Sequence, residues 1–156
     1  MNKQRFQRTI LIGILLFGAA FLVAILADSF RTVVSAEEFT SLVEEAGYSV
    51  REKEHPSEQV EIYLIADCDT FYVEFLAHET MADARHTFGQ IRDDLEQSQG
   101  LVAHGWSSSG FNSWYEQIAP DGQVARMVRI RSTIIFVNAA GENGAHVAEI
   151  MEMLGQ

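Results

Sequence analysis

Hydrophobic residues follow three patterns along this chain, and the first is an unbroken run. Residues 9–27, TILIGILLFGAAFLVAILA, contain nineteen positions without a charge. As a helix they would be about 30 Å long, close to the thickness of a bilayer's hydrocarbon core. A cleaved signal peptide has a shorter apolar core of about 7 to 15 residues, although acceptable residues at 25–27 and 34–36 leave cleavage open. The length therefore favours a retained transmembrane anchor over 9–27.

The second pattern is helical spacing, which occurs in three places. Residues 35–38, SAEE, have the form of a capping box, and apolar residues at helical spacing follow until Gly47. Thr80, three residues before Asp83, begins a second helix that runs to about Gln97 with one apolar stripe. A third amphipathic helix is predicted from about Asn143 to Gly155.

The third pattern is alternation, which is typical of β-strands with two different faces. It predicts strands over 48–51, 60–67, 71–76, 101–106, 114–119, 124–130 and 133–139. The connections are short, and one is the turn sequence Pro120-Asp121-Gly122. We therefore predict an α+β domain, a mainly antiparallel sheet with helices packed on one face, preceded by one N-terminal transmembrane helix.

The sheet face opposite this core is also apolar in the predicted register. Six residues fall on it: Tyr63, Ile65, Tyr72, Leu76, Ile134 and Phe136. One exposed apolar residue is ordinary, but six indicate that the face is at least partly covered. The sequence leaves two covers open, the first helix of the domain or a partner subunit.

The charges divide at the apolar run. Lys3, Arg5 and Arg8 precede it, whereas all 22 acidic residues follow, so residues 28–156 carry eight basic residues and a net charge of −14. The positive-inside rule then predicts a cytoplasmic stub (1–8), the anchor (9–27), a connector (28–34) and an exported domain (35–156) in the cell membrane. So acidic a domain repels phosphate backbones, which excludes nucleic acid as a partner.

Motifs for catalysis are not evident. The chain has no G-x-S-x-G, Gly-rich phosphate loop, H-E-x-x-H or C-x-x-C pattern, and its one cysteine, Cys68, lies between two aspartates that would raise its pKa. Glu79, Asp83 and His86 share one helical face, and their side chains are of types that can ligate a metal ion. Acidic residues in the first turn of a helix are, however, also favoured by the helix dipole. We predict no catalytic residue, no metal site and no cofactor.

The segment His104–Glu116, HGWSSSGFNSWYE, combines rigid aromatic residues with small hydrogen-bonding ones. This mixture is typical of adaptable binding surfaces, and Trp and Tyr often dominate interface energetics. The alternative is that both tryptophans are core residues of two paired strands. We predict a binding site formed by Trp106, Phe111, Trp114 and Tyr115.

Three segments carry a resemblance: SAEEFTSLVEEAGYSV, FYVEFLAHETMADARHTFGQIRDDLE and ARMVRIRSTIIFVNAA. With them the chain resembles a loose group of small bacterial single-pass membrane-anchored proteins without assigned function, over most of residues 35–155. The resemblance implies the fold and the location, and it transfers no site residues.

Three functions are compatible with these observations. The first is a non-enzymatic module that binds another protein or a second copy of the chain, and it fits the aromatic segment best. The second is a ligand-binding or sensing domain of the cell envelope, which requires a pocket. The third, an envelope hydrolase, requires titratable groups within hydrogen-bond reach in a cleft.

Overall fold

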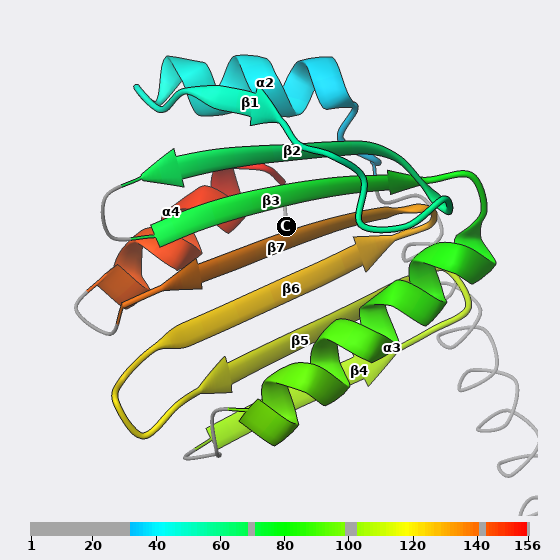
Figure 1. Ribbon diagram of the computed structural model, residues 1–156. Helices are drawn as coiled ribbons and strands as arrows, with labels where there is room; N and C mark the ends of the chain where they lie inside the picture. Colours follow the sequence, from blue (N-terminus) through cyan, green and yellow to red (C-terminus); the bar gives the residue numbers. More distant parts are fainter. Residues whose placement is uncertain (1–31, 69–70, 99–102, 141–142, 156) are drawn as a thin grey trace, which may run out of the picture. The chain divides into compact units, whose positions relative to one another are not determined.

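The computed structural model describes residues 32–68, 71–98, 103–140 and 143–155, which form three helices and seven strands (Figure 1). The elements follow the predicted order, and their types are confirmed. In chain order they are α2 (Ala36–Glu45), β1 (Val50–Glu52), β2 (Val60–Cys68), β3 (Phe71–His78), α3 (Met81–Ser98), β4 (Ala103–Ser108), β5 (Asn112–Ile118), β6 (Val124–Ile130), β7 (Thr133–Ala139) and α4 (Gly144–Met153).

The predicted caps are present at the helix ends. The Ser35 hydroxyl accepts the N–H of Glu38 at 3.1 Å, and Gly47 adopts a positive φ of 92° just after α2. The Thr80 hydroxyl likewise accepts the N–H of Asp83 at 3.2 Å and begins α3. These bonds satisfy backbone donors that the first turn of a helix leaves unpaired.

All seven strands belong to one antiparallel sheet in the order β1-β2-β3-β7-β6-β5-β4. Two meanders, β1-β2-β3 and β4-β5-β6-β7, join where β3 pairs with β7. Because β3 is central and β4 is an edge strand, the connection between them must cross three strands. The 18 residues of α3 span about 27 Å as a helix and make this crossing.

Helices cover both faces of the sheet, so the prediction that they pack on one face was wrong. α2 and α4 pack through Phe39, Val43 and Val147 on the face that carries Phe71, Val73 and Phe75 of β3. α3 packs through Ala84, Phe88 and Leu95 on the opposite face (Figure 1). The helical spacing showed which side of each helix is buried, but it holds no information on which face of the sheet receives it.

α3 is therefore the cover of the second apolar face, rather than the first helix or a partner subunit. It buries Leu76 and Ile134 almost fully, whereas Tyr63, which pairs with Leu76 from β2, and Tyr72, further along β3, stay partly exposed. On the face of α2 and α4, Trp114 and Ile118 of β5 are 42% and 38% exposed. Each face thus keeps some partly exposed apolar residues.

The predicted anchor, residues 9–27, lies outside the described residues. Among the residues that are described, no helix is both long and apolar enough to cross a bilayer.

Candidate functional site

The four predicted binding residues lie on the β4–β5 hairpin, and the structure does not bring them to one surface. Trp106 pairs directly with Tyr115, so both side chains lie on the α3 face, while Trp114 points to the opposite face. Trp106, Trp114 and Phe111 are 52%, 42% and 40% exposed, but Tyr115 is fully buried. Three exposed rings therefore surround the hairpin on both faces and at its turn.

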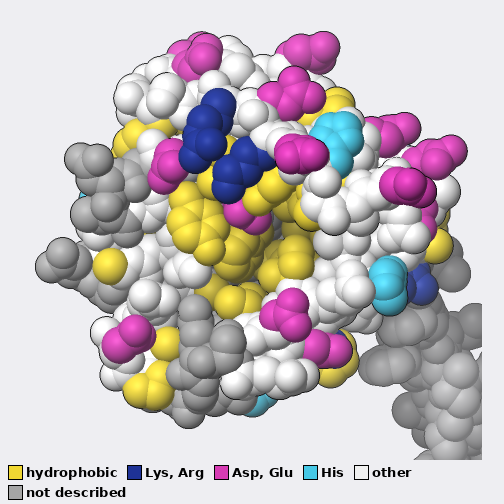
Figure 2. Space-filling view, viewed as in Figure 1, with side chains coloured by type: hydrophobic (Ala, Val, Ile, Leu, Met, Phe, Trp, Pro, Cys, Tyr) yellow, Lys and Arg dark blue, Asp and Glu magenta, His cyan; other side chains and the backbone are white. Residues whose placement is uncertain are grey.

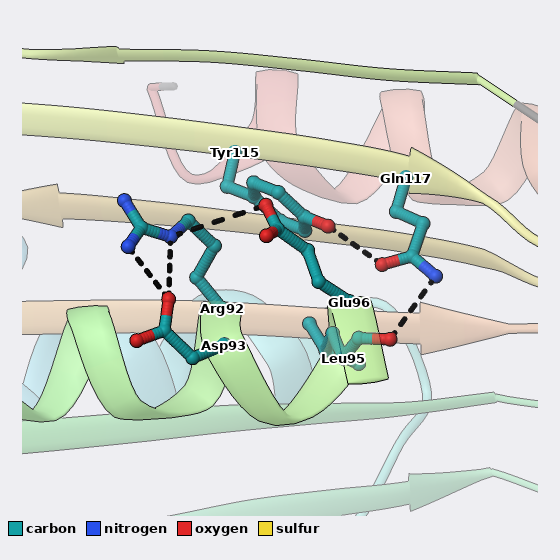
Figure 3. A network of polar contacts seen from close by, with 6 residues as sticks. All are labelled: Arg92, Asp93, Leu95, Glu96, Tyr115 and Gln117. Atoms are coloured by element: carbon teal, nitrogen blue, oxygen red, sulfur yellow. Dashed lines mark hydrogen bonds and ion pairs between the residues drawn. The ribbon is translucent and has the colours of Figure 1, made fainter. Parts of the chain in front are cut away.

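Tyr115 attaches α3 to the sheet (Figure 3). Its hydroxyl donates to Gln117 Oε1 at 2.6 Å, and Gln117 Nε2 donates to the carbonyl of Leu95 at 3.4 Å. Burial raises the pKa of the Tyr115 hydroxyl, which keeps it a donor. The role of Tyr115 that the contacts show is structural.

Arg92 of α3 connects this region to Trp106. Its guanidinium lies 5.3 Å from the centre of the Trp106 ring and pairs with Asp93 at 2.6 Å. The attraction between a cation and the face of an aromatic ring favours one orientation of a tryptophan that is only half buried. Trp106 is therefore positioned by α3 without being covered by it.

Arg129 of β6 is fully buried and holds the turn of the hairpin through hydrogen bonds. Its guanidinium donates to the carbonyls of Ser109, Phe111 and Arg131 and to the Ser113 hydroxyl, at 2.9 to 3.2 Å. The planar guanidinium can reach several carbonyls at once because its donors are fixed in a fork. The sequence reasoning missed Arg129, because charged residues in a predicted strand are ordinarily placed on an exposed face.

The serines of the same segment take part in this turn. The Ser109 hydroxyl accepts the N–H of Asn112 at 2.9 Å, and the hydroxyls of Ser108 and Ser113 are 2.9 Å apart. These contacts give all three serines a role in holding the hairpin.

β4 forms one outer edge of the sheet. The N–H of Ser109 donates to the carbonyl of Asn112 at 2.6 Å, and antiparallel pairing then continues without a bulge. Because bonded and non-bonded pairs alternate in such a ladder, the N–H and C=O groups of His104, Trp106 and Ser108 point away from β5. The edge is six residues long and contains no Lys, Arg, Asp, Glu or Pro.

The other edge of the sheet differs in length and in charge. β1 is only three residues long and includes Arg51 and Glu52. Short length and charge are the usual protections against pairing with another chain. β4 has neither protection.

A groove lies on the α3 face, between α3 and the β2–β3 hairpin. The groove has a volume of about 540 Å³, and its lining includes Pro56, Ser57, Tyr63, Glu74, Leu76, Ile91, Asp93 and Asp94. Figure 2 shows this hollow, with hydrophobic side chains at its base, an acidic side chain inside it and basic side chains along one edge. Its size is in the range of small-molecule sites.

Glu74 and Tyr63 are bonded to each other at the base of this groove. The Tyr63 hydroxyl donates to Glu74 Oε1 at 2.6 Å. Burial and then the bond to Glu74 raise the pKa of Tyr63 far above its ordinary value, so the phenol stays neutral. The sequence signal for this site was a carboxylate on a strand face that is otherwise apolar, between Tyr72 and Leu76, and it was not recognised.

The predicted alternatives for metal chemistry can also be placed. The Asp83 carboxylate accepts a hydrogen bond from Thr80 at the start of α3, the position that the helix dipole favours. In the described ranges, no three His, Cys, Asp or Glu side chains are grouped closely enough to hold a metal ion.

Comparison with known proteins adds evidence on the fold alone. No family model and no curated protein matches the chain, so the resemblance to a group of membrane-anchored proteins stays a prediction. The crystal structure of a GTP-binding regulator from Thermotoga maritima is similar, with a TM-score of 0.51 and 12% identity over 77% of this chain and 84% of that one. It supports an α+β fold with a mainly antiparallel sheet.

Proposed function

We propose that residues 32–156 form a non-catalytic interaction module that pairs its β4 edge with an extended segment of a partner protein. One observation carries this proposal: β4 is an unprotected edge strand flanked by exposed tryptophans on both faces. A segment added to β4 would bond to the outward groups of His104, Trp106 and Ser108. Its alternate side chains would meet Trp106 on one face and Trp114 on the other.

The location of this module is part of the proposal. The apolar run 9–27 and the preceding Lys3, Arg5 and Arg8 support a single-pass anchor with the domain outside the cytoplasm. On that basis the partner is another protein of the cell envelope or a second copy of the chain.

Nucleotide binding does not form part of the proposal. The Thermotoga maritima protein is described as a GTP-binding regulator, but at 12% identity it shares only a fold with this chain. The groove has Glu74, Asp93 and Asp94 among its lining residues, and these carboxylates would repel a triphosphate.

The edge can be tested by photocrosslinking in intact membranes. A photoreactive phenylalanine analogue at Ser107 should form an adduct with the partner segment. His104→Pro removes one outward N–H while leaving the bonds to β5 in place, and it should abolish the adduct. Trp106→Ala should reduce it by about tenfold or more if this ring is an interface anchor.

His104→Ala is the matched control, because it removes the same side chain and keeps the N–H group. Its adduct should equal that of the parent protein. An adduct that persists unchanged in both His104→Pro and Trp106→Ala would show that β4 is not the binding edge.

A further inference from the structure

The groove beside α3 contains a carboxylate, Glu74, that forms no ion pair in the described part of the chain. Glu74 is partly buried and accepts a hydrogen bond from Tyr63, a neutral group. Within the described residues it forms no ion pair, and none of the groove-lining side chains is basic. Partly burying a carboxylate without a cation is unfavourable, so the site is suited to a ligand that brings one.

The other lining groups indicate what such a ligand looks like. Asp94 lies on α3 at the side of the groove with no ion-pair partner in the described part of the chain, whereas Asp93 is already paired with Arg92. Leu76, Ile91 and the Tyr63 ring provide an apolar base. A ligand with a positive charge at one end and a flat apolar body would pair with the carboxylates and pack on the apolar base.

We propose that the groove binds a small organic cation, an amine joined to an aromatic or other flat apolar body. The ammonium group lies between Glu74 and Asp94, and the apolar body packs on Tyr63, Leu76 and Ile91. Tyr63 acts as a positioning residue, since its bond to Oε1 fixes the Glu74 carboxylate and leaves the other oxygen, Oε2, for the ligand.

Two basic residues near the groove bear on this proposal. The ammonium group of Lys53 lies 5.7 Å from the centre of the Tyr63 ring, which shows that this ring already attracts a cation. Arg51 is paired with Asp67 at 2.8 Å. Lys53 is therefore a competitor for the ligand, and removing its charge should not weaken binding.

This site is independent of the proposed function. The groove and β4 have no residue in common. A failure of either experiment therefore leaves the other hypothesis standing.

Three probes with one aromatic body and different end groups test the proposal: phenethylamine, 2-phenylethanol and 3-phenylpropionate. They are titrated into the full chain in a non-ionic detergent micelle at neutral pH, with binding measured by calorimetry. The amine should bind, and raised salt should weaken it. The alcohol should bind at least about tenfold more weakly, because a charge-assisted bond is lost, and the acid should not bind.

Four variants show whether the amine binds to the groove carboxylates or is attracted only by the negative charge of the whole domain. Glu74→Gln keeps an acceptor for Tyr63 and should weaken the amine by about tenfold, and Asp94→Asn should weaken it by a smaller factor. Glu152→Gln, on α4, removes one exposed carboxylate from the opposite face of the sheet and should change nothing. Lys53→Gln should bind equally well or more tightly.

Equal binding of the amine and the alcohol would overturn the proposal, as would an unchanged affinity in a folded Glu74→Gln variant. The thermal unfolding temperature of each variant shows whether it is folded. Absence of binding by the amine would also overturn it.

Discussion

His78 connects three parts of the fold through one buried imidazole. It is 2% exposed, its Nδ1 lies 3.3 Å from the carbonyl of Ser132, and its Nε2 lies 3.0 Å from the Thr87 hydroxyl. Because a carbonyl only accepts, Nδ1 carries the proton and Nε2 accepts from Thr87. These are the roles of the neutral ring, and burial, which lowers the pKa of His78, favours that neutral form.

The lowered pKa predicts acid sensitivity. The unfolded chain takes up a proton near the ordinary value of about 6.5, whereas the folded chain does so only at lower pH. Stability from the neutral ring is therefore fully present above about pH 6.5 and is lost as pH falls through the folded pKa. The unfolding temperature should therefore be lower at about pH 5 than at about pH 7.5.

The contribution of His78 can be isolated with His78→Gln. An uncharged amide at this position should give a lower unfolding temperature at neutral pH and a flatter pH dependence. The other histidines are unchanged in this variant. Parallel pH curves for the two proteins would contradict the assignment.

At the scale of elements, the β4–β5 hairpin depends on a close approach between Gly105 and Trp114. A Cβ added at Gly105 would lie 2.9 Å from Cη2 of the Trp114 ring, so this glycine lets the ring lie across β4. The ring thereby covers one face of β4 at Gly105 and leaves the outward N–H and C=O groups of the strand free to pair. The glycine belongs to the exposed aromatic surface rather than to the turn.

Gly105→Ala should push the Trp114 ring outward with a stability cost below about 1 kcal/mol. In a Trp106→Phe background Trp114 is the only tryptophan. Acrylamide should quench the Trp114 fluorescence more readily when Gly105→Ala is added to this background than in the background alone. Gly110→Ala is the control, since a Cβ there meets no atom within 4 Å; equal quenching in both variants would show that the ring is free of β4.

At the scale of the whole molecule, the division of charge makes a prediction about topology. Positive charges flanking an apolar segment hold that end in the cytoplasm. In right-side-out membrane vesicles, external protease should therefore digest a tag placed after Gln156, and alkaline carbonate should not extract the chain. A variant that combines Lys3→Glu, Arg5→Glu and Arg8→Glu should protect a substantial fraction of the tag from the protease.

A matched triple substitution within the domain, at Arg51, Lys53 and Arg85, changes the net charge equally but comes well after the apolar run in the sequence. It should leave the tag fully accessible. Extraction of the parent chain by carbonate would contradict the anchor. Full protection of the parent tag would contradict the orientation.

The sequence by itself determined the helices, the strands and their order, because these follow from local rules. Ser35 and Thr80 supply capping hydroxyls, Gly47 supplies a left-handed position, and period-two alternation marks the strands. It also determined that both faces of the sheet are apolar. Each of these signals depends on residues within about one or two turns of one another.

Only the tertiary structure decided which helix covers which face, and with that the candidate sites. The apolar stripe of a helix does not show which face of the sheet it packs on, so the placement of α3 could not be predicted from Phe88 or Leu95. That placement buries Tyr115, leaves Trp106 exposed against Arg92, and forms a groove over Glu74. Binding surfaces arise where elements distant in sequence leave space between them, and that space depends on long-range packing.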